Sequence, residues 1–426
     1  LIILNIFMLN RAAILGGGRI PFQPSNTIYG KYSNYDLIKK AISGVLHQTK
    51  INPSEIDNIL VGNVIQEVKT SNVAREAALG CGISSKVPAS TIAQACISSS
   101  QCVSIGADQI KLNQSELVLA GGVETFSDVP IRYPKIMRKW LINLPKESKK
   151  GPLNSMKYMS KLRPNYFKPE PPALANYTTG ELMGATSEKI AERFNVSRSD
   201  QDEFTIRSHN LAYEAHKNKL YDNEIFPVDG NTMENNIRPN QEISKIGKLK
   251  SSFKKNGTHT AANSTGLSDG ATACIISSQD KAKELNIDPL AFIEDSVFIG
   301  TDPYEEMLLG PAYAISKLLA RNNLTVNDID VFEIHEAFAG QILANLNALN
   351  TESFCRDSLN SNKVGEIPFD KLNLWGGSLA IGHPLAASNI RNIMTAVNRL
   401  HRENKEIALV AACADSGLAN AMLIKR

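Results

Sequence analysis

Two cysteines and two histidines in this sequence have the surroundings of reactive groups, because each stands beside a short apolar run and small residues. A histidine beside a cysteine can take its proton and generate a nucleophile. A second thiol can act as a general acid and base, and a second histidine can donate a hydrogen bond to a developing oxyanion. The sequence therefore predicts cysteine-based nucleophilic catalysis. The four residues are Cys96, His335, His383 and Cys413.

The segment 91–110 predicts a particular corner for Cys96. Residues 91–95 are mostly apolar, as in a buried strand, and the segment after Cys96 has three serines followed by apolar residues at helical spacing. Backbone N–H groups at a helix start stabilise negative charge, so we expect a lowered thiol pKa and a thiolate at neutral pH. The alternative is an ordinary buried cysteine, since free cysteine is among the most buried residue types.

Zinc is another hypothesis for two cysteines and two histidines. The four residues come from separate segments without the short ligand pairs of structural zinc sites, so we expect no metal. All six cysteines are scattered, which is typical of free thiols in a reducing compartment rather than of a disulfide framework.

Charge and hydropathy argue against a nucleic-acid-binding or membrane-spanning protein. The net charge of +3 is too small to indicate nucleic-acid binding, and 42% hydrophobic residues are enough for a large core. The N-terminal LIILNIF is too short for a membrane span and has no basic region or cleavage site of a signal peptide. We therefore expect a soluble, intracellular protein, located in the cytoplasm.

Strands alternating with helices predict a layered α/β fold with a mostly parallel sheet. The order strand, reactive corner, helix, strand ending in small residues occurs around Cys96 and again around His383, which predicts two similar subdomains. Their expected extents are 8–280 and 287–426. In such a pair the loops at the strand ends converge on one cleft.

Residues 127–258 are expected to be an inserted helical loop domain, with helices at 180–193 and 199–220. Ser199 and Asp202 have the spacing of a capping box for the second of these helices. Between 132 and 168 the insertion has eleven basic residues against one acid, Glu147, interleaved with apolar residues. This pattern is typical of a basic amphipathic segment on an anionic surface, but equally of a solvated positive face or a patch for a phosphorylated ligand.

Several motifs together resemble the thiolase family. They are CISSSQC, AGGVE, HEAFAG and GGSLAIGHP, with a cysteine after the final strand. Further stretches are most similar to the β-subunit of the fatty-acid-oxidation trifunctional complex, and the resemblance extends from about residue 11 to the C-terminus. These are NVAREAALG, RSHNLA, AANSTGLSDGA, LLGPAYAISK and the basic insertion.

The resemblance implies a thiolase-like fold of five layers (α-β-α-β-α) and the activity of a 3-ketoacyl-CoA thiolase in fatty acid β-oxidation. Cys96 would attack the 3-keto carbonyl and become acylated, and His383 would deprotonate Cys96 and later activate the CoA thiol. Cys413 would protonate the departing acetyl-CoA enolate. His335 stands where the family has Asn or His and would hold the thioester oxygen through a water.

The resemblance also implies how the substrate is held. The backbone N–H of Cys96, with one from the loop after Cys413, would form a second oxyanion hole. The stretch lining the pantetheine channel and the edge of the insertion would contact CoA. The matching residues are Asn263, Ser264, Gly266 and Met183.

No cofactor is implied beyond coenzyme A as a substrate. The expected assembly is a homodimer or larger homo-oligomer, in complex with a hydratase/dehydrogenase α-subunit. Residues 132–168 would give peripheral contact with a membrane, and no nucleic acid is expected.

Two loops depart from the family pattern. Residues 385–389 and 414–420 have fewer glycines than the family, and Asp415 adds a carboxylate that we expect to raise the pKa of Cys413. Two other hypotheses are a thiolase-like protein that binds acyl-CoA with weak or no turnover, and a condensing enzyme of the ketoacyl-synthase type. The terminal Cys413 argues against the last of these.

Overall fold

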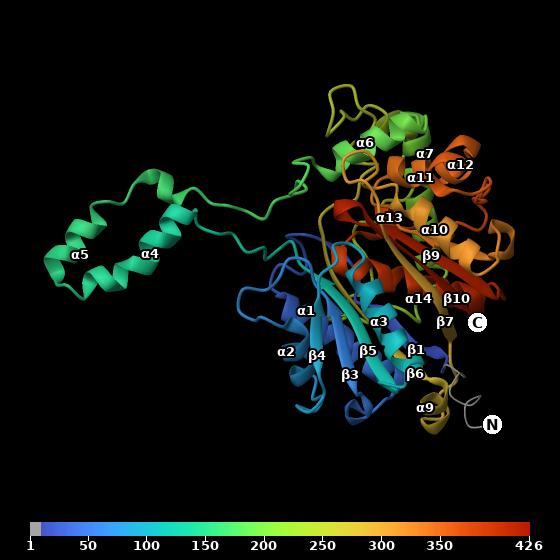
Figure 1. Ribbon diagram of the computed structural model, residues 1–426, viewed down its shortest axis with the longest axis horizontal. Helices are drawn as coiled ribbons and strands as arrows, with labels where there is room; N and C mark the ends of the chain where they lie inside the picture. Colours follow the sequence, from blue (N-terminus) through green and yellow to red (C-terminus); the bar gives the residue numbers. More distant parts are fainter. Residues whose placement is uncertain (1–9) are drawn as a thin grey trace. The chain divides into compact units, whose positions relative to one another are not determined.

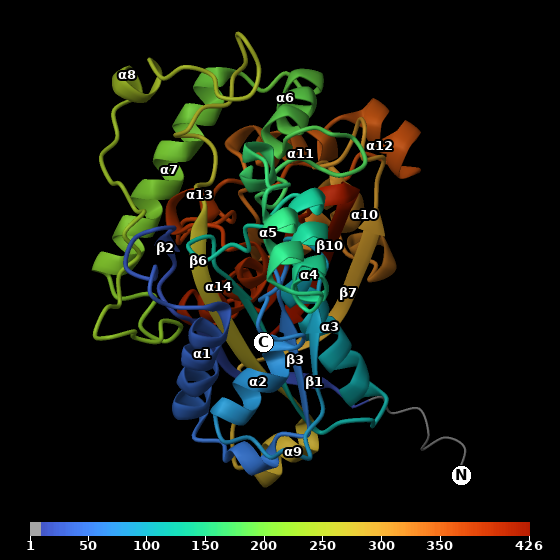
Figure 2. The same ribbon diagram turned by 90° about the vertical axis from the view of Figure 1, so that its left-hand side faces the viewer.

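The computed structural model describes residues 10–426, so the apolar N-terminal LIILNIF lies outside the described residues. The chain divides into two compact units (Figures 1 and 2). The main unit contains the residues up to Ser127 and those of Ala175–Arg426, and the small unit is Asp128–Leu174.

The first half of the main unit contains a sheet in the order β4-β3-β5-β6-β1. The strand β3 is parallel to β4 and to β5, whereas β6 is antiparallel to β5 and to β1. The short β2 pairs with β6. The strands are β1 Ala12–Arg19, β2 Gln23–Pro24, β3 Asn58–Gly62, β4 Ala89–Ile92, β5 Leu117–Glu124 and β6 Ser268–Ser278.

The second half repeats this arrangement. Its strands are β7 Ala291–Gly300, β8 Val331–Ile334, β9 Ile407–Cys413 and β10 Leu418–Lys425, in the order β8-β9-β10-β7. A parallel bridge from Phe332 to Leu372 occupies the edge position that β4 has in the first half. The halves join where β1 pairs with β7 over residues 12–14. The repeated order supports the predicted pair of subdomains.

The sheet is mixed, so the expectation of a mostly parallel sheet is wrong. Parallel pairing occurs where a helical crossover joins consecutive strands, as between β3 and β4 or β8 and β9. A short loop joins β9 to β10 as an antiparallel pair, and β6 returns antiparallel beside β5 after the long segment 125–267. The alternation of strands and helices in the sequence does not show that β6 and β10 are antiparallel to the strands beside them.

Helices cover both outer faces and fill the space between the halves. α1 and α2 share a core with the first sheet, and α10, α11 and α12 share one with the second. α3 and α14 form a third core with strands of both halves, which completes five layers. These helices are α1 Asn34–Thr49, α2 Val73–Gly80, α3 Ser98–Lys111, α10 Gly310–Arg321, α11 Ala339–Leu349, α12 Glu352–Leu359 and α14 Ser388–Arg402.

Further helices and 3-10 turns connect this framework. They are the helices α6 Met183–Arg193, α7 Arg198–Lys217, α8 Ile243–Ile246, α9 Gln279–Glu284 and α13 Ser378–Ile381, with 3-10 turns η2 Pro53–Glu55, η4 Val326–Asp328, η5 Leu385–Ala387 and η6 Asp415–Gly417. The predicted insertion 127–258 extends across both units, since only Asp128–Leu174 is separate and α6 and α7 belong to the main unit.

The capping box of α7 differs from the expected one. Ser197 and Asp200 form it, two residues before the predicted pair, so the expected box of Ser199 and Asp202 is wrong. The same S-x-x-D spacing occurs at both positions, and the chain uses the first. Asp202 is instead buried, where it pairs with Arg198 at 2.7 Å.

The small unit is a pair of helices, α4 Lys135–Ser148 and α5 Pro152–Met159, followed by η3 Pro164–Phe167. Trp140 of α4 stacks on Tyr158 of α5 with ring centroids 5.4 Å apart, and hydrogen bonds of 3.3 Å join the pair in both directions. Arg132 and Glu170 close the base of the unit through two backbone hydrogen bonds. Across residues 10–426, no helix has the length and apolar character needed to cross a bilayer.

Replacing Trp140 by Ala should loosen the small unit alone. The stack holds the two helices together, and removal of a large buried aromatic side chain costs about 3 kcal/mol. Hydrogen–deuterium exchange should become faster in α4 and α5 and stay unchanged in α3 and α14. Phe167→Ala, at an exposed aromatic of the same unit, is the control. Unchanged exchange in α4 after the Trp140 substitution would contradict this account.

Candidate active site

Cys96 lies at a sharp corner between β4 and α3. Ala95, directly before it, has a φ of 46°, in the left-handed region where residues other than glycine are uncommon. The Ser98 hydroxyl secures this corner, since it accepts a hydrogen bond from the Gln94 N–H at 2.8 Å and donates one to the Ala95 carbonyl at 2.7 Å. The predicted order of strand, corner and helix is present.

The Cys96 thiol contacts His383, which comes from the opposite half of the main unit. Its Sγ lies 3.3 Å from Nε2 of His383, and Nδ1 of the same ring lies 2.6 Å from the Ser388 hydroxyl. When the thiol donates to Nε2, the ring proton is on Nδ1 and is donated to Ser388. Ser388 therefore positions His383 with a basic nitrogen facing the thiol.

Burial keeps this pair neutral at rest. It raises the pKa of Cys96 to about 12 and, with the positive charge of Arg391, lowers the pKa of His383 to about 3. The backbone N–H groups of Asp415 and Cys96 lower the pKa of the thiol, but by less than burial raises it. Burial therefore opposes the thiolate at rest that the sequence predicts, and Nε2 of His383 lies where it can accept the thiol proton.

His335 and Cys413 complete the cluster. The ring centroid of His335 lies 4.2 Å from that of His383, and burial is the main cause of its lowered pKa. Cys413 ends β9 and is buried, and it lies near enough to Cys96 that a thiolate there raises its pKa further. All four residues predicted from the sequence therefore meet where loops of both halves converge.

Asp415 acts on a different cysteine from the expected one. Its carboxylate raises the pKa of Cys96, whereas the pKa of Cys413 is raised by burial and by Cys96. The carboxylate accepts a hydrogen bond of 2.7 Å from the buried side chain of Asn176, which also donates to the Ser416 hydroxyl at 3.0 Å. The side chain is thus held while its backbone N–H faces the thiol.

Most of the missing glycines have no conformational consequence. Ala386, Ala387 and Asn389 have negative φ angles, which any residue adopts. Ser416 alone among the replaced positions lies in the left-handed region, with a φ of 66°. Gly417 follows it at a φ of 75°, where an added Cβ would lie 2.5 Å from the Thr301 carbonyl oxygen. The loop therefore keeps a glycine at the position of closest approach.

Two polar residues that the sequence does not mark as functional lie near the Cys96 corner. The Asn389 amide, at the start of α14, donates to the Cys96 carbonyl at 2.6 Å. Glu124 ends β5, and its buried carboxylate accepts from the N–H groups of Val64 and Ile65. Burial raises the Glu124 pKa to about 7. Glu124 was visible only as the last letter of AGGVE, and Asn389 only as a departure from the family pattern.

The stretch 263–267 runs beside both histidine loops. Ser264 bridges to Phe338, just after His335, and Leu267 bridges to His383. The Ser264 hydroxyl is buried and has no partner within the described chain, whereas Asn263 uses its amide on Asp202 and Thr258.

Gly266 and Met183 are the other two predicted contacts. A Cβ at Gly266 would meet nothing within 4 Å, and Met183 is half-buried at the start of α6. Contact of Asn263, Ser264, Gly266 and Met183 with CoA stays a prediction. Within residues 10–426, no group of three or more His, Cys, Asp or Glu side chains has the arrangement of a metal site.

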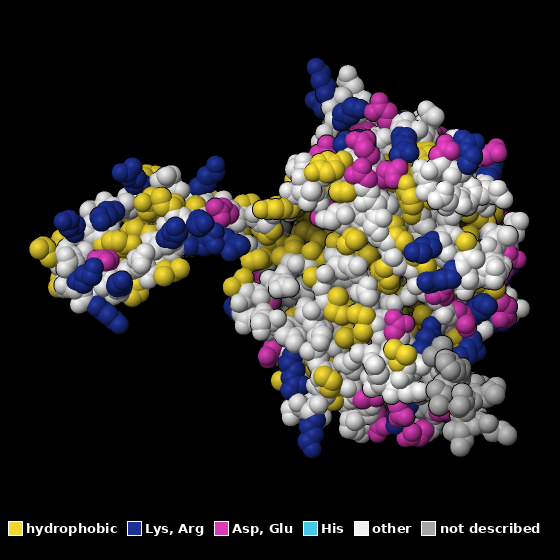
Figure 3. All heavy atoms as spheres, in the orientation of Figure 1, with side chains coloured by type: hydrophobic (Ala, Val, Ile, Leu, Met, Phe, Trp, Pro, Cys, Tyr) yellow, Lys and Arg dark blue, Asp and Glu magenta, His cyan; other side chains and the backbone are white. Residues whose placement is uncertain are grey.

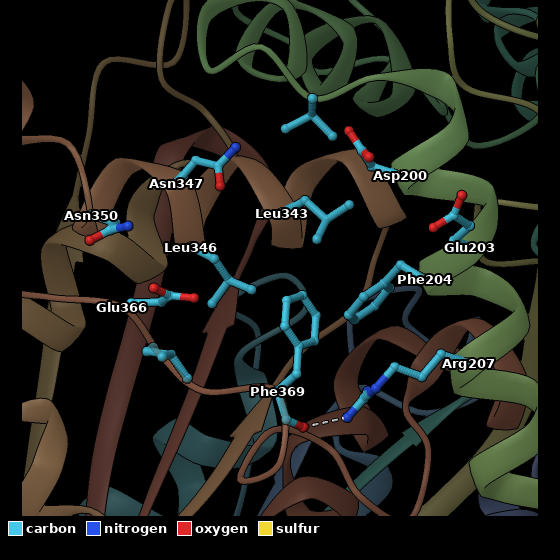
Figure 4. Close-up of a pocket in the computed structure, with 12 residues that line it drawn as sticks. Asp200, Glu203, Phe204, Arg207, Leu343, Leu346, Asn347, Asn350, Glu366 and Phe369 are labelled. Carbon is cyan, nitrogen blue, oxygen red and sulfur yellow. Dashed lines mark hydrogen bonds between the residues drawn. The ribbon is translucent and has the colours of Figure 1, made fainter.

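A separate groove of about 470 Å³ lies between α7 and α11 (Figure 4). Its floor includes Phe204 and Phe369, and Arg207 donates a hydrogen bond of 2.7 Å to the Phe369 carbonyl. None of the four clustered cysteines and histidines lines it. The chemistry of the cluster therefore has no part in this groove.

The repeated five-layer fold and the thiol–imidazole contact between its halves agree with a family comparison. The chain matches the thiolase N-terminal domain over residues 12–280 and the thiolase C-terminal domain over residues 287–426. The chain belongs to the thiolase family.

Individual relatives are similar over nearly the whole chain. The mouse protein named "Trifunctional enzyme subunit beta, mitochondrial" is 45% identical, covering 98% of this chain and 88% of its own length. A Caenorhabditis elegans protein named "Probable 3-ketoacyl-CoA thiolase" is 44% identical, over 96% and 92% of the two chains. The crystal structure of human mitochondrial 3-ketoacyl-CoA thiolase has a TM-score of 0.82 at 28% identity, covering 98% and 99% of the chains.

Asp415→Asn should make Cys96 easier to alkylate. The amide removes the negative charge that raises the pKa of Cys96 but can still accept from Asn176. A lower pKa means more thiolate at a given pH, so the rate of iodoacetamide labelling of Cys96 at pH 8 should rise by a few-fold. Mass spectrometry of the Cys96 peptide measures this rate.

The control for this experiment is Ser416→Gly, which relaxes the same loop without a change of charge. In the parent protein the labelling rate should keep rising with pH up to at least pH 9, because the thiol pKa lies above that range. A plateau near pH 7, or equal rates for Asp415→Asn and the parent, would contradict the assignment.

Proposed function

We propose that the protein is a 3-ketoacyl-CoA thiolase of fatty acid β-oxidation, an acetyl-CoA acyltransferase that uses CoA to cleave 3-ketoacyl-CoA into acetyl-CoA and a shortened acyl-CoA. The observation that carries the proposal is the 3.3 Å contact between Cys96 and His383 from opposite halves of a thiolase fold. The name of the Caenorhabditis elegans relative at 44% identity supports the substrate class. Coenzyme A enters as a substrate, and we propose no cofactor.

The first half-reaction forms the acyl-enzyme. As Cys96 attacks the 3-keto carbonyl, its proton passes to Nε2 of His383, which is neutral and therefore able to accept it. The carbon–carbon bond then breaks, and the acetyl-CoA enolate leaves with the electron pair. The Cys413 thiol protonates this enolate. Its raised pKa keeps the thiol protonated until that step.

The second half-reaction releases the acyl group to CoA. The proton that His383 took from Cys96 first passes to the Cys413 thiolate, which restores both groups. His383 then takes the proton of the incoming CoA thiol, whose sulfur attacks the acyl group on Cys96, and gives this proton to the departing Cys96 thiolate. The backbone N–H groups of Cys96 and Asp415 already favour negative charge at the thiol and would stabilise the oxyanion of this step. His335 would serve the thioester oxygen of the acetyl unit through a water. The reaction regenerates the Cys96 thiol.

Cys96→Ser should abolish formation of the acyl-enzyme, because a hydroxyl is a far weaker nucleophile than a thiolate. Thiolysis of acetoacetyl-CoA and of a longer 3-ketoacyl-CoA should fall by on the order of 10⁴-fold or more. Mass spectrometry after mixing the parent with substrate should locate the acyl group on Cys96. Cys81→Ser, at a half-buried thiol outside the cluster, is the control.

An adduct on Cys102 or Cys413 would overturn the assignment. A parent protein that binds acyl-CoA but neither acylates Cys96 nor consumes the thioester would instead favour the thiolase-like binding protein. The binding-protein alternative rests on the loop after Cys413, where Asp415 and Ser416 depart from the family pattern.

The assembly is proposed from the relatives. The mouse relative is named as the β-subunit of a trifunctional enzyme, which supports a complex of this chain with a different subunit. We propose that this subunit is an α-subunit of the hydratase/dehydrogenase type. We propose a homodimer or larger homo-oligomer as the thiolase part of that complex. The same name contains "mitochondrial", which favours a mitochondrial location over the cytoplasmic one expected from composition.

The small unit is proposed to lie on an anionic membrane surface. Lys and Arg side chains gather over α4 and α5, with apolar side chains between them (Figure 3). Apolar side chains that the unit leaves exposed include Ile136, Leu141, Ile142, Leu153 and Met156. Several of its lysines have no carboxylate within 4 Å among the described residues, so their charges remain available for lipid phosphates.

Removing five of these charges should release the protein from acidic vesicles. A basic residue near an anionic surface contributes roughly 1 kcal/mol of binding free energy. Co-sedimentation with cardiolipin-containing vesicles should therefore be lost, while thiolysis of acetoacetyl-CoA is unchanged. The substitutions to Gln are at Lys135, Lys139, Lys146, Lys149 and Lys157.

The matched control makes the same change of charge on exposed lysines of the main unit. Its substitutions to Gln are at Lys86, Lys219, Lys248, Lys250 and Lys255. Equal loss of binding in both variants, or no binding by the parent, would refute the membrane hypothesis.

A further inference from the structure

His335 is fully enclosed, and the described chain gives its ring a single hydrogen bond. Its Nδ1 lies 2.9 Å from the Ser378 hydroxyl, at the start of α13. Its Nε2 is buried and has no partner among the described residues. The ring sits against His383, so the free nitrogen belongs to a residue of the catalytic cluster.

The Ser378 hydroxyl has a second partner, the guanidinium of Arg391. Nη2 of Arg391 donates to the Ser378 oxygen at 2.8 Å. Arg391 is on α14, eight residues after His383, and it is buried. Arg391, Ser378 and His335 thus form one continuous hydrogen-bonded row.

The buried positive charge of Arg391 has few negative groups near it. Its nearest carboxylate, Glu333, is 3.9 Å away and makes its 2.8 Å hydrogen bond with Arg399 instead. The Nε of Arg391 has no partner within the described chain. A buried charge with so little pairing is costly, which favours a role for the hydrogen bond that Arg391 does make.

The direction of the protons in this row follows from the donors. A guanidinium only donates, so Ser378 accepts from Arg391. The Ser378 hydrogen then has one acceptor within reach, Nδ1 of His335. The His335 proton is consequently on Nε2. In the other tautomer the Ser378 oxygen would accept twice, and its own hydrogen would be buried without an acceptor, which is unfavourable.

We propose that Arg391 and Ser378 are positioning residues that hold His335 as the neutral Nε2–H tautomer, with this N–H directed to the oxygen of the substrate thioester or its bound water. This inference rests on the proposed thiolase function. It gives the two adjacent histidines opposite tautomers. His383 has its proton on Nδ1 and presents a base, whereas His335 has its proton on Nε2 and presents a donor.

Arg391 also opposes protonation of both rings. Its positive charge adds to burial in lowering the pKa of His383 and of His335. A neutral His335 keeps its Nε2–H as a hydrogen-bond donor and has little tendency to take a proton from the substrate. The Arg391 guanidinium thus sets the direction in which the hydrogen bonds of this row donate. It also keeps the His335 ring neutral.

The first test reads the tautomer directly in the full-length protein. Nitrogen NMR of protein labelled with ¹⁵N-histidine distinguishes a protonated from an unprotonated ring nitrogen, and His335→Gln assigns the signals. The parent should show protonated Nε2 and unprotonated Nδ1 at His335. Ser378→Ala and Arg391→Met should each weaken or reverse this preference, and Ser378→Thr, which keeps a hydroxyl, should retain it.

The matched control is Ser208→Ala. The Ser208 hydroxyl is also buried beside α13, where it accepts from the Gly377 N–H at 3.1 Å and donates to Glu336, but it does not touch His335. The tautomer should be unchanged in this variant. A protonated Nδ1 in the parent, or a tautomer unaffected by both Ser378→Ala and Arg391→Met, would overturn the proposal.

The second test reads the consequence for catalysis. Solvent deuterium exchange into the α-carbon of acetyl-CoA reports enolate formation, the step that a donor to the thioester oxygen stabilises. Ser378→Ala should slow this exchange by up to about 10²-fold with little change in KM, and Ser208→Ala should not. Acylation of Cys96 by a simple acyl-CoA should be spared in both.

The two tests separate the inference from the proposed function. Rapid exchange in His335→Gln would overturn the thioester-binding role of His335, and with it that part of the proposal, whereas the NMR result alone decides the direction of the protons. Absence of Cys96 acylation in the parent would refute the thiolase function while leaving the tautomer measurable.

Discussion

The structure depends on one contact between groups that burial keeps uncharged. The Cys96 thiol and the His383 imidazole lie 3.3 Å apart, with pKa values of about 12 and about 3, so neither ionises alone at neutral pH. Reactivity therefore requires that both groups change charge together as the substrate arrives. Such a pair is ineffective unless its geometry is fixed, and the surrounding residues provide this constraint.

That geometry is produced by the join between the two halves. Cys96 precedes α3 and His383 precedes α14, and these helices pack in one core with strands of both sheets. The Asn389 amide of α14 is bonded to the Cys96 carbonyl, and the Ser388 hydroxyl to the His383 ring. The segment 263–267 then connects the two histidine loops from the side. No single loop could hold the cluster, because its members belong to strands far apart in the sequence.

Much of this site could be predicted from the sequence, because reactive residues beside strand ends converge when strands and helices alternate. Cys96, His335, His383 and Cys413 were identified in that way and do lie together. The sequence predicts a thiolate at Cys96 from the helix start, but it does not show the burial that opposes this charge. The influence of Asp415 was assigned to its neighbour in sequence, Cys413, whereas the carboxylate acts on Cys96. Ser378 and Arg391 were not found, because the sequence does not show which hydroxyl a buried guanidinium reaches.

The Asn389 side chain limits which residues this position can accept. It occupies a fully buried site at the start of α14, where it satisfies the carbonyl of the nucleophile itself. Replacing Asn389 by glycine would leave a void and an unpaired carbonyl beside Cys96, with a loss of stability from both. A loop with glycine at this position therefore needs other neighbours to fill the space and to bind the Cys96 carbonyl.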